Sequence, residues 1–262
     1  MHVYAHRGAS IDRPENTLAA FAAALELGVE GIELDVVRSK DDQLVVIHDL
    51  TLDRTTNGTG PVRELTATEM GKLDAGDGEH VPTLAAVLEL IGGRARVNIE
   101  LKQPDLAGLV IEVVSDHPEL EWFASGAHWE ALAELRRQVG AVVYPLTLGR
   151  MENLTVMLDL GRRARQDFDA AAVIGELGPV ATGLDDAIGA AVRMGAEGLS
   201  VWEHDLTADD IASVRDHGLQ VWVWTVNDPA RAAELIRLGV DAICTDDPAA
   251  VLDVRDQPAP AV

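Results

Sequence analysis

The stretch GIELDV, residues 31–36, alternates apolar and acidic side chains. Successive side chains of a β-strand point to opposite faces, so Glu33 and Asp35 share one face while the apolar residues share the other. If the apolar face packs beneath helices, both carboxylates point into the interior of a closed sheet. Two unpaired buried carboxylates are costly, because each loses its hydration and repels the other. Either one of them is protonated or a cation lies between them.

Short strand-like segments recur along the chain, and helical patterns separate most of them. Eight segments are strand-like: the first ends at Tyr4-Ala5-His6, and the others are Gly31–Val36, Val97–Lys102, Glu121–Ser125, Val142–Thr147, Gly198–Trp202, Gln220–Val226 and Asp241–Thr245. The helical patterns are one capped by Asn16 or Thr17 and ended by Gly28, then Leu84–Ile91, Leu106–Ser115, Trp129–Val139, Asp185–Met194, Ala208–His217 and Pro229–Leu238. Eight strands alternating with helices predict an α/β fold, a (β/α)8 TIM barrel, and a doubly wound open sheet is the alternative.

Two regions depart from this alternation. Gln43–His48 is typical of a strand, but only a short polar turn separates it from residues 31–36, so the two strands should form an antiparallel hairpin. Residues 49–80, with Asn-Gly and Gly-Pro turn signals, are then interpreted as a small loop-rich insertion after the second strand. Residues 148–185 are too many for a simple connection, and we expect part helix and part lid.

Length and composition favour one globular unit. The 262 residues are 47% apolar, and we assign 1–250 to a single barrel domain and 251–262 to a C-terminal tail. The single cysteine, Cys244, excludes an internal disulfide and a cysteine-built zinc site, and we expect it in the core. A net charge of −23 argues against a broad surface for nucleic acid or acidic lipid. The chain shows no membrane span or secretory signal, so we expect a cytoplasmic protein, with its oligomeric state left open.

A second strand repeats the acidic pattern. In Val97–Lys102, the side chains of Asn98, Glu100 and Lys102 share one face. If this strand lies beside residues 31–36, three carboxylates and one ammonium converge near the C-terminal ends of the strands. Such a hard, oxygen-rich site suits Mg²⁺ or Ca²⁺. The alternative is an internal ion-pair network between Lys102 and a carboxylate, without a metal.

Two histidines are expected at the same end of the barrel. His6 ends the first strand and His48 ends the hairpin strand, and active sites of (β/α)8 barrels occupy the C-terminal ends of the strands. Imidazole titrates near neutrality, so one ring can accept a proton while the other donates one. Arg7 offers a planar fork for phosphate oxygens. Asp49 could orient a ring or merely begin the following turn.

Four further residues complete the set of candidates. Trp222 and Trp224 share a face, and we expect Trp222 in the core and Trp224 as an apolar wall for a small substrate. Glu15 fits helix initiation and could also brace Arg7. Of the remaining histidines, which we expect at the surface, only His204 follows a strand and is a further candidate.

The chain resembles the glycerophosphodiester phosphodiesterase family nearly from end to end. The matching pieces are AHRGAS (5–10), PENTLAAF (14–21), the stretch 28–60, VPTLAAVLELI (81–91), VNIELK (97–102), VWVWTVND (221–228) and GVDAICTDDP (239–248). The resemblance implies a (β/α)8 barrel with an insertion at about residues 49–80. The chain departs from the family at residues 125–128, where it has Ser-Gly-Ala-His and family members commonly have Ser-Phe followed by a polar residue. Residues 148–185 show no family pattern.

The resemblance also implies an activity and a role for each candidate. The reaction would hydrolyse a glycerophosphodiester, such as glycerophosphocholine or glycerophosphoethanolamine, to glycerol 3-phosphate and an alcohol. One divalent cation, Mg²⁺ or Ca²⁺, would be the cofactor. The acid/base pair would be His6 and His48, the metal ligands Glu33, Asp35 and Glu100, the phosphate-binding residues Arg7 and Lys102, and the wall of the glycerol pocket Trp224.

Three alternatives remain open. A lysophospholipid-cleaving phospholipase D would use the same chemistry but would need an apolar groove. A non-catalytic barrel could bind phosphodiesters without cleaving them. A metal-dependent aldolase or isomerase is also compatible with the fold, which hosts many chemistries.

Overall fold

A closed parallel sheet forms the centre of the computed structural model, which describes residues 1–164 and 170–257. Its strands are β1 (His2–His6), β2 (Gly31–Arg38), β4 (Arg96–Leu101), β5 (Trp122–Gly126), β6 (Val143–Thr147), β7 (Gly198–Trp202), β8 (Gln220–Trp224) and β9 (Ala242–Thr245). Each strand pairs in parallel with its neighbours, and β1 closes the ring by pairing with both β2 and β9. The predicted (β/α)8 barrel is confirmed, and the open-sheet alternative is excluded.

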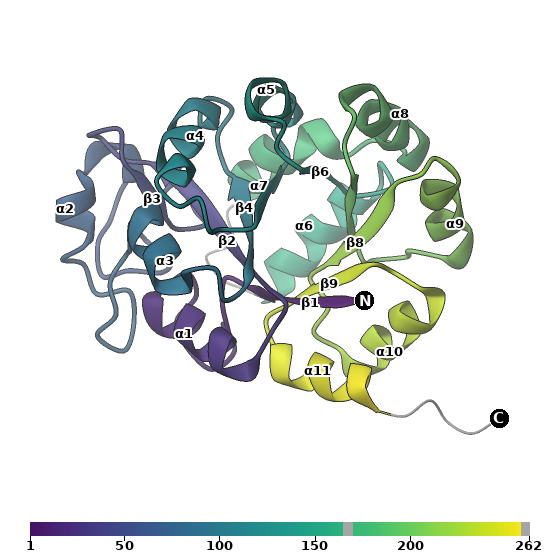
Figure 1. Ribbon diagram of the computed structural model, residues 1–262, viewed down its shortest axis with the longest axis horizontal. Helices are drawn as coiled ribbons and strands as arrows, with labels where there is room; N and C mark the ends of the chain where they lie inside the picture. Colours follow the sequence, from purple (N-terminus) through teal and green to yellow (C-terminus); the bar gives the residue numbers. More distant parts are fainter. Residues whose placement is uncertain (165–169, 258–262) are drawn as a thin grey trace.

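A ring of helices surrounds the sheet (Figure 1). These are α1 (Leu18–Leu27), α3 (Leu84–Ile91), α4 (Ala107–Ser115), α5 (Trp129–Val139), α8 (Leu184–Met194), α9 (Ala208–Asp216), α10 (Pro229–Leu238) and α11 (Pro248–Asp256). Thr17 is the N-cap of α1, because its hydroxyl oxygen accepts a hydrogen bond from the amide of Ala20, and Gly28 ends the helix at a positive φ of 74°. Asn16, the other candidate cap, uses its side chain elsewhere, as described below.

The end of the chain differs from the sequence interpretation. Residues 251–256, which we expected in a tail, belong to α11, while residues 258–262 of that tail lie outside the described residues. The Asp247 carboxylate accepts a hydrogen bond from the amide of Ala250, and Pro248 opens the helix. This Asp-Pro start signal is visible in the sequence.

The expected hairpin and insertion are both present. Strand β3 (Leu44–Val46) pairs antiparallel with β2, with Val46 opposite Val36. The insertion that follows contains the 3₁₀ turn η1 (Val62–Glu64) and the short helix α2 (Ala67–Met70). It has its own apolar core, made by Val37, Val45, Ile47, Leu52, Val62, Ala67, Met70 and Val81.

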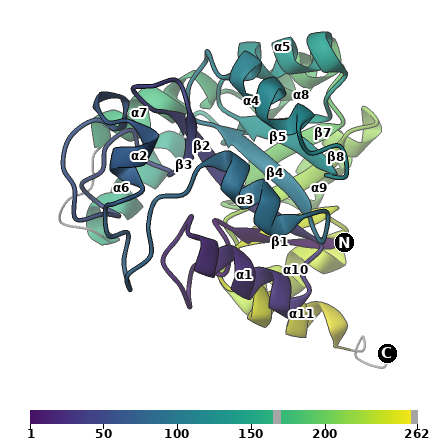
Figure 2. The same ribbon diagram turned by 60° about the vertical axis from the view of Figure 1, so that its left-hand side comes forward.

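Residues 148–185 contain helices, as expected. These are α6 (Asn153–Ala164), α7 (Ala170–Leu177) and the 3₁₀ turn η2 (Gly178–Val180). Figure 2 shows α2, α6 and α7 at the end of the barrel toward which the strands run, opposite the N-terminus. The insertion and this segment therefore both cover the end where the candidate residues lie.

An aromatic layer fills the barrel beneath the polar residues. Tyr4, Phe123, Tyr144 and Trp222 pack with ring centroids 4.2–5.7 Å apart. A Cβ at Gly31 would lie 2.0 Å from the Tyr4 ring, so glycine leaves the space that this ring occupies. Along β2, Glu33 and Asp35 follow Gly31 on the same face and therefore stand above the aromatic layer. The core position expected for Trp222 is confirmed.

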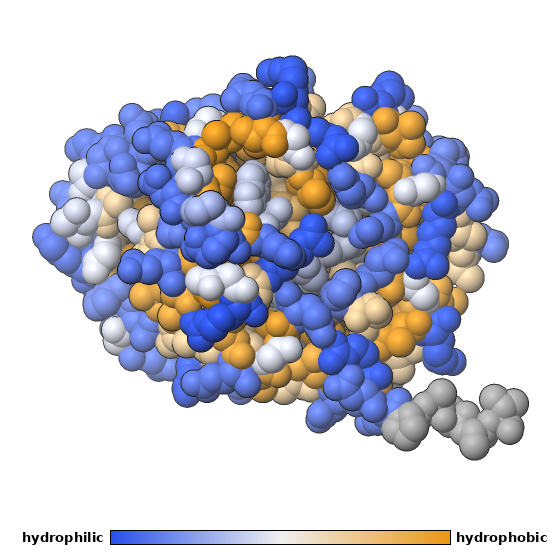
Figure 3. All heavy atoms as spheres, viewed as in Figure 1, coloured by the Kyte–Doolittle hydropathy of each residue, from blue (hydrophilic) through white to orange (hydrophobic). Residues whose placement is uncertain are grey.

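The outer surface is largely hydrophilic on the face that the view shows, and the chain as a whole is acidic. Figure 3 shows hydrophilic residues over much of the face toward the viewer, with smaller areas of hydrophobic residues among them. Lys and Arg number 21 against 44 Asp and Glu. Within the ranges 1–164 and 170–257, no helix has the length and apolar character needed to cross a bilayer.

Candidate active site

Three carboxylates meet at the C-terminal ends of β2 and β4. The strands are parallel neighbours with Glu33 opposite Asn98 and Asp35 opposite Glu100. One carboxylate oxygen from each of Glu33, Asp35 and Glu100 lies within 4.8 Å of the other two. Glu33 and Asp35 are buried and Glu100 is half-buried. The alternating pattern of the two strands therefore produces one acidic cluster inside the barrel.

The cluster has donor atoms suited to a hard cation. Glu33 Oε1 and Asn98 Oδ1 are buried and have no hydrogen-bond partner within the described part of the chain. Burial, together with the charges of Asp35 and Glu100, raises the pKa of Glu33 well above its usual range. A bound divalent cation would relieve both the repulsion and the missing contacts. The three carboxylates therefore fit a divalent metal site.

Two cations lie against the same cluster. Arg7 Nε is 3.2 Å from Asp35 Oδ2, and Lys102 Nζ is 3.0 Å from Glu100 Oε1 and 3.6 Å from Asp35 Oδ1. Burial opposes the ionisation of Asp35, but Arg7, His48 and Lys102 outweigh it and hold the pKa of this carboxyl well below its usual range. The structure thus contains the ion pairs of the metal-free alternative. Two cations cannot neutralise all three carboxylates of the cluster, however.

A tight turn places Arg7 over β2. Arg7 and Gly8 have φ angles of 59° and 86°. A Cβ at Gly8 would also lie 2.6 Å from the carbonyl carbon of Ala20, so glycine is required there. The Arg7 amide donates to Glu33 Oε2 at 3.0 Å, and its Nη1 donates to Glu15 Oε1 at 2.8 Å. The structure thus shows the suggested contact between Glu15 and Arg7.

Each candidate histidine is paired with an aspartate. His6 Nδ1 is 2.6 Å from Asp246 Oδ1, and its Nε2 is 4.0 Å from Glu33 Oε2. His48 Nδ1 is 2.6 Å from Asp49 Oδ1. The pairing fixes each ring through Nδ1 and leaves Nε2 for proton transfer. Burial, with the charges of Arg7 and Lys102, lowers the pKa of His48.

A hydrogen-bonded network ties the insertion to the site. Arg54 donates from Nε to Asp49 Oδ2 at 2.7 Å and from Nη1 to Glu15 Oε2 at 2.7 Å. Burial opposes the ionisation of Glu15, but Arg54 and Arg7 lower its pKa to about 2. Arg54 was not predicted from the sequence, because its bridge from Asp49 to Glu15 joins residues 34 positions apart.

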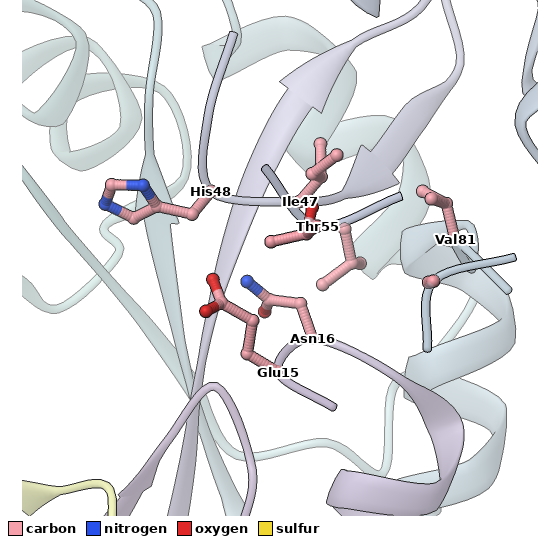
Figure 4. A pocket seen from close by; sticks show the side chains of 8 residues that line it. Glu15, Asn16, Ile47, His48, Thr55 and Val81 are labelled. Carbon is pink, nitrogen blue, oxygen red and sulfur yellow. The ribbon is translucent and has the colours of Figure 1, made fainter. Parts of the chain in front are cut away.

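The insertion packs closely behind His48. Figure 4 shows the His48 ring pointing away from Ile47, Thr55 and Val81, which line a small cavity with Glu15, Asn16 and others. Its volume of about 10 Å³ is near the minimum for one water molecule. Asn16 also reaches the acidic cluster, because its Nδ2 donates to Asp35 Oδ2 at 2.8 Å. His48 and Asn16 thus join the lining of this cavity to the acidic cluster.

Two further acidic residues at this end of the barrel, Asp246 and Glu176, were not predicted from the sequence. Asp246 follows β9, and besides His6 it accepts hydrogen bonds from Ser10 Oγ at 3.1 Å and Asn227 Nδ2 at 2.6 Å. Its position at a strand end was the available signal. Glu176 of α7 makes a direct ion pair with Lys102 Nζ. No sequence pattern could have found it, because the contact joins β4 to a distant helix.

The other candidates occupy different surroundings. Trp224 is half-buried, and its Nε1 is buried without a hydrogen-bond partner in the ranges that the structure covers. His204 stacks on Trp202 with centroids 4.8 Å apart and lies 3.2 Å from Asp205. His204 also lines an open hollow of about 550 Å³, together with Arg150 and Arg231 among others.

Comparisons with known proteins agree with the (β/α)8 fold and show the family of the chain. Residues 6–250 match the model of the glycerophosphoryl diester phosphodiesterase family. A glycerophosphodiester phosphodiesterase of Caldanaerobacter subterraneus is 35% identical over 96% of both chains. The crystal structure of a Thermotoga maritima glycerophosphodiester phosphodiesterase has a TM-score of 0.74 at 26% identity, with 98% of each chain covered. An Oleispira antarctica phosphodiesterase, solved with sn-glycerol-3-phosphate, shares the fold at a TM-score of 0.78 and 23% identity, with 98% of this chain and 97% of that one covered.

Proposed function

The chain belongs to the glycerophosphoryl diester phosphodiesterase family and is a phosphoric diester hydrolase, and we propose that it hydrolyses glycerophosphodiesters such as glycerophosphocholine or glycerophosphoethanolamine. The products would be glycerol 3-phosphate and the head-group alcohol. One observation carries the proposal: a cluster of three carboxylates lies at the same end of one barrel as two histidine–aspartate pairs and the cations Arg7 and Lys102. A small anionic diester needs these groups together.

We assign one divalent cation, Mg²⁺ or Ca²⁺, to Glu33, Asp35 and Glu100. When bound, the cation supplies positive charge that offsets the phosphate and the charge added in the transition state. Arg7 and Lys102, both held against Asp35, would bind the phosphate oxygens from the same side. Trp224 would form the apolar wall against the glycerol.

The two histidines are suited to different proton transfers. A lowered pKa keeps His48 neutral near pH 7, which is the form that accepts a proton from the nucleophile. His6, held through Nδ1 by Asp246, would donate a proton from Nε2 to the departing alkoxide. The nucleophile is water or a glycerol hydroxyl of the substrate, and the second route would pass through a cyclic phosphodiester.

Metal-stripped protein incubated with a panel of glycerophosphodiesters tests the proposal. Added Mg²⁺ or Ca²⁺ should restore the release of glycerol 3-phosphate, which is identified by its coupled oxidation or by mass. Full turnover in excess EDTA would contradict the metal assignment. Preference for a lysophospholipid over glycerophosphocholine would support the phospholipase D alternative, and intact substrate after long incubation with metal would support the non-catalytic one.

A further inference from the structure

We propose that Glu176 selects substrates by the charge of their head group. When substrate binds, the Glu176 carboxylate would leave Lys102, which then binds the phosphate, and would pair with a cationic ammonium group of the head group. This inference rests on the proposed function and concerns which glycerophosphodiesters the site prefers. It assigns a role to α7, which lies in the segment that shows no family pattern.

The position of Glu176 brings an extra carboxylate to the phosphate-binding lysine. Helix α7 lies at the end of the barrel toward which the strands run (Figure 2), and the Glu176 side chain is 24% exposed. Its carboxylate makes a direct ion pair with Nζ of Lys102, a side chain that is 3% exposed. Burial opposes the ionisation of Glu176, but Lys102 and His48 outweigh it and lower the pKa of this carboxyl. It is therefore an anion at neutral pH.

Lys102 contacts three carboxylates, and we expect them to behave differently when metal and substrate bind. Asp35 and Glu100 belong to the cluster that would hold the divalent cation. Glu176 lies outside that cluster, so it remains the competitor of the substrate phosphate for Lys102. An arriving phosphate must displace it, and the displaced carboxylate then faces an anion of the same sign.

The chemistry of the head group decides whether this displacement is compensated. In choline and ethanolamine esters two carbons separate the ester oxygen from the cationic nitrogen, so the cation stays close to the phosphate. A cation at that distance can interact with the Glu176 carboxylate after it leaves Lys102. Glycerol and inositol head groups carry no charge, so they leave the Glu176 carboxylate without a cationic partner. The site should therefore favour cationic head groups.

A charge-neutral variant tests this assignment. Kinetics of Glu176→Gln and of the unchanged protein are compared on glycerophosphocholine and glycerophosphoethanolamine, and on glycerophosphoglycerol and glycerophosphoinositol, at saturating metal. We expect kcat/KM for the cationic pair to fall relative to the uncharged pair by about tenfold, mainly through KM. Asp159→Asn is the matched control, because it removes one charge from α6 at an exposed side chain paired with Arg162. This control should leave the ratio unchanged.

The outcomes separate this inference from the proposed function. A Glu176→Gln variant that is folded, as a thermal melt verifies, but leaves the ratio of the cationic to the uncharged pair unchanged would overturn the proposal. Glu176 would then only hold α7 in place. If the unchanged protein cleaves none of the four diesters, the proposed function itself fails and the selection fails with it.

Discussion

The two histidine–aspartate pairs differ at the level of single residues. Asp49 follows His48 directly and is also held by Arg54, whereas Asp246 reaches His6 from the far end of the chain. His48 lies in the field of Arg7 and Lys102, while the Nε2 of His6 lies 4.0 Å from a Glu33 oxygen. Two identical side chains with opposite electrostatic neighbours are suited to opposite halves of one proton-transfer reaction.

Removal of either ring tests these roles. His6→Ala and His48→Ala should each lower kcat by about 100-fold or more, because each removes a positioned proton donor or acceptor. The measurement is steady-state kinetics on glycerophosphocholine with saturating metal. His217→Ala is the control, since its exposed ring forms a hydrogen bond with the Ser213 carbonyl oxygen at the end of α9, far along the chain from both site histidines. A near-normal rate in either site variant would remove that residue from the mechanism.

The pH profile provides a second test of His48. Burial, Arg7 and Lys102 lower its pKa, so the neutral base is present at and above neutral pH and is lost only as the pH falls through the lowered value. The acidic limb of kcat/KM should therefore have its midpoint below about 6.5, the ordinary pKa of histidine. The residual activity of His48→Ala should lack this limb. A midpoint above 6.5 would argue against His48 as the base.

At the scale of elements, β2 depends on one glycine beneath its two carboxylates. The Tyr4 ring is fully buried and fills the space beside Gly31, with further rings behind it. An added methyl group would therefore push against a packed aromatic layer rather than into solvent. The strand that carries Glu33 and Asp35 is positioned by this packing.

Gly31→Ala should lower the free energy of unfolding by about 1–3 kcal/mol, the usual cost of an overpacked core. Gly108→Ala is the matched control in α4, because nothing lies within 4 Å of the Cβ it would add. The control should be neutral or should stabilise by up to about 1 kcal/mol, since alanine favours a helix. Urea unfolding of both variants measures the difference. Equal stability of the two would show that the aromatic layer yields readily.

The insertion is connected to the catalytic end through Arg54. Arg54→Ala would free Asp49 and Glu15, which it now holds together, and would loosen the residues that orient His48 and Arg7. We expect kcat to fall about tenfold through misplacement of these groups. Arg63→Ala, at an exposed position in the same insertion, should keep full activity. If both variants behave alike, the insertion has no part in positioning the site.

The elements that the sequence predicted well are those with local signals. Strand alternation, the Thr17 cap and the Gly28 stop lie within a few residues of the structure they specify, so the helices and the β2–β3 hairpin followed directly. The alternation of β2 and β4 also placed the three carboxylates together. Asp246 and Glu176 were missed because their partners lie 240 and 74 positions away, and the contact of Arg54 with Glu15 spans 39 positions, although its other partner, Asp49, is five positions away. Only the closed barrel brings such residues into contact.

For the whole molecule, net charge and local charge oppose each other. The chain carries a formal charge of −23, yet the phosphate group of the proposed substrate is an anion that would bind at Arg7 and Lys102. A bound divalent cation would change this total little. At a distance an anionic diester therefore meets a repulsive field, and attraction begins only near the mouth of the site.

Ionic strength separates these two fields. Salt shortens the screening length from about 30 Å at 0.01 M to about 8 Å at 0.15 M, which removes the distant repulsion first. For glycerophosphoglycerol, which has a net negative charge, kcat/KM should rise about twofold over this range at saturating metal. Glycerophosphocholine has no net charge and should change little, so the ratio of the two corrects for effects of salt on the protein itself. If kcat/KM for the anionic diester instead falls with salt while the zwitterion stays constant, the local field of Arg7, Lys102 and the cation extends beyond the mouth and outweighs the acidic surface.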